Sequence, residues 1–177
     1  MPSLSRAASV LFIAFLASGL TACWGGPRSY TIKVSQAWPP GELPAMEVDL
    51  VTVTAHELEQ DLWGEFSVRS YFKPDTHEDK LRNLYRDKKF SLRFDDDHPG
   101  PHTVPGSDPL WDRRLDENAD HVVVLANIPM NWEGSPDKDP RRLVLPLHSK
   151  YWESSEIELR LTEIKIELRT PQLVVDE

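Results

Sequence analysis

The chain has 177 residues, 29 of them acidic and 20 basic, which gives a formal net charge of −9 at neutral pH. This balance argues against nucleic acid as a partner and against electrostatic attachment to anionic lipid, because both need an excess of cationic side chains. A single cysteine excludes a disulfide within the chain.

The first 22 residues have the pattern of a signal peptide. One positive charge, Arg6, precedes an uncharged apolar run over residues 7–20. This run has the length of a signal-peptide core and is shorter than the ~20 residues of a membrane span. The tetrapeptide LTAC at residues 20–23 resembles the lipobox of bacterial lipoproteins, with the cysteine at Cys23. The alternative is an ordinary secretory signal followed by an accidental cysteine.

The lipobox resemblance implies that the Cys23 thiol receives a diacylglyceryl group and that cleavage falls before Cys23. The new amine then receives a further acyl chain such as palmitate, and two or more chains anchor a protein stably to a bilayer. Trp24 replaces the Asp that retains lipoproteins at the inner membrane in enteric bacteria, which favours the outer membrane. We expect a signal peptide at 1–22, a short tether at 23–29 and a single domain at 30–177.

Alternating apolar and polar side chains predict half-buried strands at several places in this domain, because successive strand residues point to opposite faces. The continuous apolar run at 122–125 predicts a strand buried on both faces. Pro146 places one strand at a sheet edge or at its own end. The expected strands span residues 30–35, 48–54, 65–72, 89–94, 119–128, 142–147 and 156–169.

The last of these strands contains a slip in phase. Apolar residues alternate over 157–161 and then in the opposite phase over 164–168, which predicts a β-bulge or a tight corner near Thr162 and Glu163. A helix there would align only four of the six apolar positions.

Two short helical segments interrupt the strands. Leu58 and Leu62 are four residues apart and predict a helix over 55–63, with Thr54 as its N-cap. Residues 79–86 predict a short amphipathic turn or helix, and the proline-rich residues 95–109 predict an irregular loop. Seven short strands with brief helical inserts predict an all-β fold, an antiparallel β-sandwich.

The segment 95–102 (DDDHPGPH) is the candidate for metal binding. Its spacing matches neither an EF-hand loop nor a pair of histidines one helical turn apart. We interpret it as a solvated acidic loop, with His98 and His102 as the remaining metal candidates. No serine lies in a nucleophile elbow, and no glycine-rich loop could hold a phosphate. We therefore expect neither catalysis nor a cofactor.

The tryptophans fall into two groups. Trp63, Trp111 and Trp152 lie near apolar positions and are expected in the core. Trp38 and Trp132 lie in connectors that contain proline or glycine, where a large ring either anchors a partner or folds back to cover the end of the sandwich.

The order of these features resembles the outer-membrane lipoprotein family of the type VI secretion system. The resemblance rests on the lipobox, the strand at 30–35, the loop at 37–45, the strand at 48–53 and the late strand pair at 122–126 and 142–147. The chain departs from the family in two places. The first is the segment VDLVTVTAHEL, where the family has an apolar run with Arg and a Tyr-Gln-Leu ending. The second is its extended 95–109 loop.

The resemblance implies a transthyretin-like sandwich that is tethered to the outer membrane and faces the periplasm. Its first loop would dock on the periplasmic domain of an inner-membrane secretion component, through Trp38, Pro39, Glu42 and Leu43. Two other functions remain open from the residues: a lipoprotein that binds a small ligand or a metal, and a lipid-anchored hydrolase.

Overall fold

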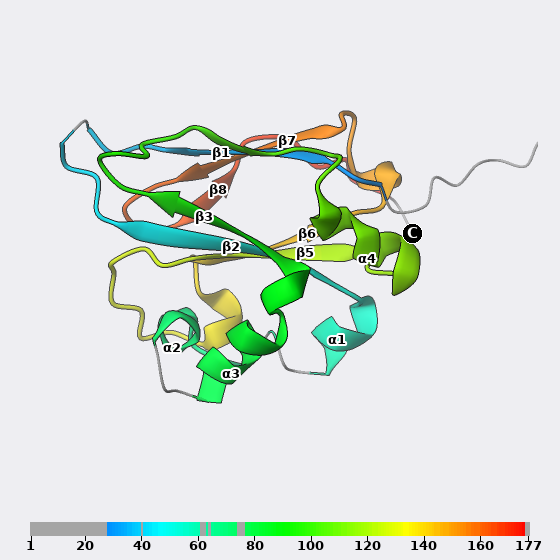
Figure 1. Ribbon diagram of the computed structural model, residues 1–177, viewed down its shortest axis with the longest axis horizontal. Helices are drawn as coiled ribbons and strands as arrows, with labels where there is room; N and C mark the ends of the chain where they lie inside the picture. The colour runs from blue at the N-terminus through cyan, green and yellow to red at the C-terminus, as the bar shows by residue number, and fades with distance from the viewer. Residues whose placement is uncertain (1–27, 40, 61–62, 64, 74–76, 176–177) are drawn as a thin grey trace, which may run out of the picture.

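Two four-stranded sheets pack face to face in the computed structural model, which describes residues 28–175 except 40, 61–62, 64 and 74–76 (Figure 1). The expected signal peptide, Cys23 and most of the tether lie outside the described residues. Within them, no helix is long and apolar enough to cross a membrane. The two sheets packed face to face confirm the expected β-sandwich.

The first sheet has the strand order β4-β1-β7-β8. Strand β1 lies between β4, which runs antiparallel to it, and β7, which runs parallel to it. The pairing of β1 with β7 is thus an exception to the antiparallel arrangement that the sequence predicted. The strands of this sheet are β1 (Thr31–Gln36), β4 (His102–Val104), β7 (Glu156–Leu161) and β8 (Ile166–Leu168).

The second sheet is antiparallel throughout and has the order β3-β2-β5-β6. The predicted position of the strand at 142–147 at a sheet edge is confirmed, because β6 is the last strand of this order and pairs with β5 alone among the described strands. The strands are β2 (Met46–Val53), β3 (Lys89–Phe94), β5 (His121–Ala126) and β6 (Arg142–Pro146).

The helices of residues 55–84 cover the outer face of the second sheet, so this sheet is buried on both sides (Figure 1). Val122 and Val124 of β5 face the first sheet, whereas Val123 and Leu125 face the helices. This arrangement confirms the predicted strand with two buried faces. The helices are α1 (Ala55–Glu59), α2 (Val68–Phe72) and α3 (His77–Leu84), and α4 (Asp112–Asp116) lies apart from them.

The predicted N-cap of α1 is confirmed. The Glu57 N–H donates to Thr54 Oγ1 at 3.1 Å, and the Thr54 N–H donates to Glu57 Oε2 at 2.7 Å. This reciprocal capping box satisfies two backbone donors that the first helical turn would otherwise leave unpaired. The helix is shorter than the predicted 55–63 and ends at Glu59.

Two predicted elements are wrong. The strand expected at 65–72 is helix α2, in which Val68 and Tyr71 are three residues apart and both pack into the cluster beneath the second sheet. Tertiary packing therefore outweighs the β-propensity of these side chains. The loop expected at 95–109 contains β4, a strand of three residues between Pro101 and Pro105 that is too short to show alternation.

The phase slip near Thr162 is a hairpin turn between β7 and β8. The Thr162 N–H donates to the Lys165 carbonyl at 2.9 Å, and the two strands pair in antiparallel register. The predicted tight corner is confirmed, and it divides the expected final strand into two.

Asp49 attaches the helical layer to the second sheet through a buried ionic cluster. Its carboxylate lies 2.9 Å from Arg82 Nε and 3.1 Å from Lys89 Nζ, and it accepts hydrogen bonds from Tyr71 and Ser91 at 3.1 and 2.6 Å. Burial alone would raise the pKa of Asp49, but hydrogen bonds from Arg82 and Ser91 and the nearby positive charges hold it below its ordinary value.

Replacing Asp49 by Ala should destabilise the chain by roughly 3–5 kcal/mol, because Arg82 and Lys89 lose their buried counterion. Urea unfolding measures this change. The matched control is Glu156→Ala, which removes an exposed ion pair with Lys33 and should change the free energy of unfolding by less than about 1 kcal/mol. Equal effects of the two substitutions would show that the buried cluster is not a main support of the helical layer.

The lowered pKa of Asp49 also predicts an acid dependence. The stabilisation by its carboxylate is complete above the unfolded-state pKa of about 3.9 and is lost as the pH falls through the lower folded-state value. Asp49→Asn removes this titrating group, so the variant should lose less stability than the parent chain below about pH 4. Parallel stability curves for the two proteins in acid would contradict this assignment.

Candidate functional site

The two ends of the sandwich have different roles in the path of the chain. The described chain enters at one end, where the Arg28 N–H donates to the Leu147 carbonyl at 2.8 Å; we call this the tether end. Strand β1 then runs to the opposite end, where the Ala37 N–H donates to the Leu161 carbonyl at 3.0 Å; we call this the loop end. Figure 1 shows the β1–β2 connection on the left and the start of the described chain on the right.

The loop after the first strand, residues 37–45, lies at the loop end and contains the four expected contact residues. The Glu42 N–H donates to the Pro39 carbonyl at 3.1 Å, which closes a turn. Gly41 within this turn has a φ of 80°, a conformation that side chains other than glycine rarely adopt. Pro39 and Glu42 are exposed and are therefore accessible to a partner.

The other two expected contact residues point inward. Leu43 is only 9% exposed and belongs to the core between the sheets, and Trp38 is partly buried against the same core. Trp38 therefore covers the end of the sandwich with one part of its ring and exposes the rest. Of the four expected contact residues, Pro39, Glu42 and part of Trp38 are therefore accessible from outside, whereas Leu43 supports the loop from below.

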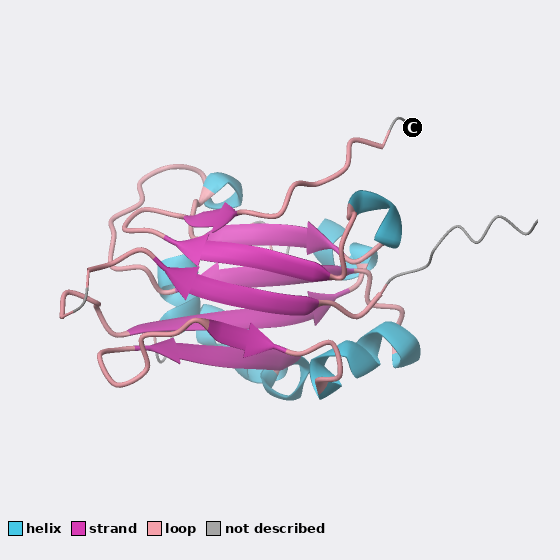
Figure 2. Cartoon of the chain, turned by 90° about the horizontal axis from the view of Figure 1, so that it is seen from above, coloured by secondary structure: helices cyan, strands magenta, loops and turns pink. Residues whose placement is uncertain are grey.

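Neighbouring connections add exposed apolar side chains to the loop end. Ile164, in the turn between β7 and β8, is 59% exposed, and this turn directly follows Leu161, to which Ala37 is hydrogen-bonded. Trp132, in the connection between β5 and β6, is 38% exposed. Large apolar side chains of this kind are common anchors in protein interfaces. Figure 2, seen from above, shows the connecting loops gathered beyond the strand ends.

The acidic segment at 95–101 also lies at the loop end, but it is organised by its own hydrogen bonds. Asp95 accepts from the backbone N–H groups of Asp97 and His98 and pairs with His98 Nδ1 at 2.8 Å. The hydrogen bond from His98 lowers the pKa of Asp95, with Arg93 acting in the same direction.

The side chains of His98 and His102 make different contacts. His102 lies on β4, where its ring packs edge-on against Phe94 at 4.5 Å between ring centroids. Among the residues that the structure describes, no group of three His, Cys, Asp or Glu side chains could hold a metal ion. His98 and His102 therefore do not form a metal site with a third such ligand there.

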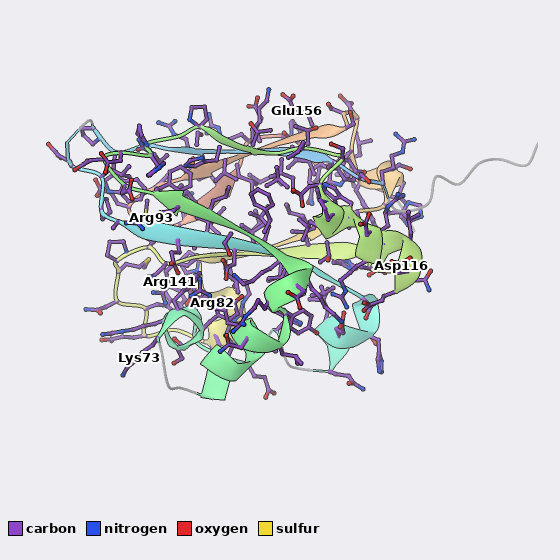
Figure 3. The ribbon with its side chains drawn as sticks, in the orientation of Figure 1. Lys73, Arg82, Arg93, Asp116, Arg141 and Glu156 are labelled. Atoms are coloured by element: carbon purple, nitrogen blue, oxygen red, sulfur yellow. The ribbon has the colours of Figure 1, made fainter. Side chains whose placement is uncertain are left out.

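Two open hollows at the loop end share Asn127 as a wall, and one of them reaches Ala45 of the 37–45 loop. One, of about 330 Å³, is lined by Ala45, Met46, Glu47, Arg93 and Asn127. The other, of about 240 Å³, is bounded by Arg69 of α2, Arg141 and the segment Asn127–Asn131. We call the two hollows together the end groove. Figure 3 shows Arg93 and Arg141 toward the loop end and Asp116 at the tether end.

The sequence did not identify the residues of the end groove. They come from segments far apart in the chain, around residues 45–47, 69, 93, 127–131 and 141. The available signal was Asn127, a polar residue directly after an apolar strand and before Pro129. The predicted core positions of Trp63, Trp111 and Trp152 are confirmed, since all three are buried.

No protein-family model and no curated protein matches the sequence. Among solved structures, the chain is similar to Serratia marcescens Lip, described as a membrane-bound component of the type VI secretion system. The two share 14% sequence identity, with a TM-score of 0.42 over 78% of this chain and 95% of that chain.

Leu43 and Glu42 are neighbours with opposite environments, which gives a paired prediction. Leu43→Ala should destabilise the chain by about 2 kcal/mol, because it leaves a cavity at the end of the core. Glu42→Ala should change stability by less than about 0.5 kcal/mol, since the exposed side chain has no partner in the described part of the chain. Chemical denaturation measures both. A neutral Leu43→Ala would contradict a supporting role beneath the loop.

Proposed function

We propose that this chain is a lipid-anchored docking protein of the bacterial cell envelope, without a catalytic role, that binds an envelope protein at its loop end. One observation carries the proposal: β1 leads directly from the tether end to the 37–45 loop at the opposite end of the sandwich (Figure 1). The six residues of β1 correspond to about 20 Å at ~3.3 Å per residue.

This geometry holds a partner at a distance from the bilayer. In the proposal, acyl chains on Cys23 anchor the chain, and residues 24–27 connect the anchor to Arg28. Four extended residues reach at most about 14 Å, so the tether end stays near the membrane and the loop end points away from it. The acidic character of the chain agrees with a body that does not lie on anionic lipid.

The strands on either side of the loop suit it to bear a load. β1 lies between β4 and β7, and β2 lies between β3 and β5. A pull between the anchor and the loop would be carried along the covalent backbone of β1, which directly joins the two. Hydrogen bonds to β4 and β7 hold this strand in the sheet, so the loop stays fixed to the body of the sandwich under load.

We further propose that the partner belongs to a type VI secretion membrane complex, which the chain fastens to the outer membrane from the periplasmic side. This assignment is supported by the order of the lipobox, first strand, loop and second strand in the sequence. Pro39, Glu42 and the exposed part of Trp38 would make the contact.

Site-specific photo-crosslinking in intact cells tests the docking site. A photoreactive residue in place of Glu42 should form a covalent adduct with an envelope protein, because position 42 is exposed at the loop end. The matched control is the same residue in place of Asp116, which is exposed at the tether end (Figure 3). We expect no protein adduct from position 116.

Two further observations complete this test. Pro39→Ala with Trp38→Ala should reduce the adduct formed from position 42 without reducing the amount of the chain in the membrane fraction. The adduct from position 42 should contain a protein of a type VI secretion complex if the specific assignment holds. Adducts from position 116 and none from position 42 would place the docking site at the wrong end and overturn the proposal.

A further inference from the structure

The end groove differs in charge from the rest of this acidic chain. Arg69 is exposed on its rim and forms no ion pair with any described residue. The Arg93 side chain is 72% exposed and pairs only through its Nε with Asp95 at 2.6 Å. A guanidinium has five N–H donors, so Arg93 keeps most of them available to a ligand. The groove therefore offers two accessible cations on a chain of net charge −9.

The other charged side chains that line the groove are held in ion pairs. Glu47 forms an ion pair with Arg82 at 2.6 Å. Arg141 is buried and paired with Asp139 at 2.7 Å, and it also donates to the Met130 carbonyl at 3.2 Å. These contacts leave Arg69 and Arg93 as the accessible cations of the groove, beside the half-exposed, ion-paired side chain of Glu47.

Asn127 separates the two hollows and is the centre of the groove. Its backbone N–H donates to the Glu47 carbonyl at 2.8 Å, which fixes its position. Its side-chain amide makes no hydrogen bond to a described residue, and neither does that of the neighbouring Asn131. A side-chain amide offers both a donor and an acceptor, which are the groups that pair with the backbone of an extended peptide.

We infer that the end groove binds an extended peptide segment of the docked protein, and that this segment carries carboxylate side chains. The carboxylates pair with Arg69 and Arg93, because guanidinium and carboxylate groups form two parallel hydrogen bonds. The peptide backbone between them pairs with the amides of Asn127 and Asn131. The inference rests on the proposed docking function, and it names the chemistry of the partner.

Continuity with the 37–45 loop favours a peptide over a small free acid. Ala45, which lines the first hollow, is the last residue of that loop. The two hollows are open to solvent and meet at one side chain, so a small molecule in either one would stay largely solvated. A segment of a protein that already contacts the loop can pass through both hollows in succession.

Peptide titration followed by NMR tests this inference on the full chain in detergent. The probe is an acetylated and amidated octapeptide of alternating Gly and Glu, and its control replaces each Glu by Gln. The Glu peptide should cause saturable shifts in the Asn127 side-chain amide and in the Nε–H signals of Arg69 and Arg93. The Gln peptide should not, and added salt should weaken binding.

Matched variants locate the binding. Arg69→Gln and Arg93→Gln should each weaken Glu-peptide binding by about fivefold, the range of a solvent-accessible ion pair. Arg86→Gln should leave binding unchanged, since Arg86 is also exposed on the helical side but does not line the groove. Equal shifts with the Gln peptide, or with free glutamate at the same carboxylate concentration, would overturn the inference. The absence of any shift with the Glu peptide would overturn it as well. So would an equal loss of affinity in Arg86→Gln.

The crosslinking result distinguishes this inference from the docking function. If the position-42 adduct forms but the Glu peptide does not bind, docking stands and the carboxylate segment is wrong. If the Glu peptide binds at the groove but no adduct forms at position 42, the groove has the inferred chemistry and the proposed docking function fails.

Discussion

The central position of β1 determines the geometry on which the proposed function depends. This strand is hydrogen-bonded on both sides, to β4 in antiparallel register and to β7 in parallel register. Because it crosses the whole sandwich, the point where the chain enters and the loop that follows the strand are held at opposite ends. The distance between them is fixed by backbone hydrogen bonds and not by flexible connections.

The second sheet and the helices that cover its outer face supply the rest of the loop end. Asp49 holds Arg82, Lys89, Tyr71 and Ser91 together beneath the sheet and so fixes the helices against it. Helix α2 carries Arg69 to the rim of the end groove. An interaction in the buried helical layer therefore supports the helix that carries a cation at the end groove, which links the stability of the fold to the chemistry of its surface.

Local sequence patterns predicted the elements whose signals are local. Alternation located β1 and β3, Pro146 indicated the edge strand β6, and Thr54 marked the start of α1. Alternation failed at residues 65–72, because contacts with a distant sheet select a helix there, and β4 was too short to show a pattern. The burial of Leu43 could not be predicted from its place in a proline-rich loop, because this burial depends on both sheets. The end groove joins residues from five segments, and no spacing in the sequence brings them together.

The most direct test of the central claim is the distance of each end of the sandwich from the bilayer. The acylated chain would be reconstituted in vesicles that contain a quencher-labelled lipid, with a fluorophore attached to a cysteine introduced at position 116 or at position 42. Strong quenching at position 116 and little at position 42 is the result expected for a sandwich that holds its loop end away from the membrane. Equal quenching at the two positions, or stronger quenching at position 42, would contradict this orientation.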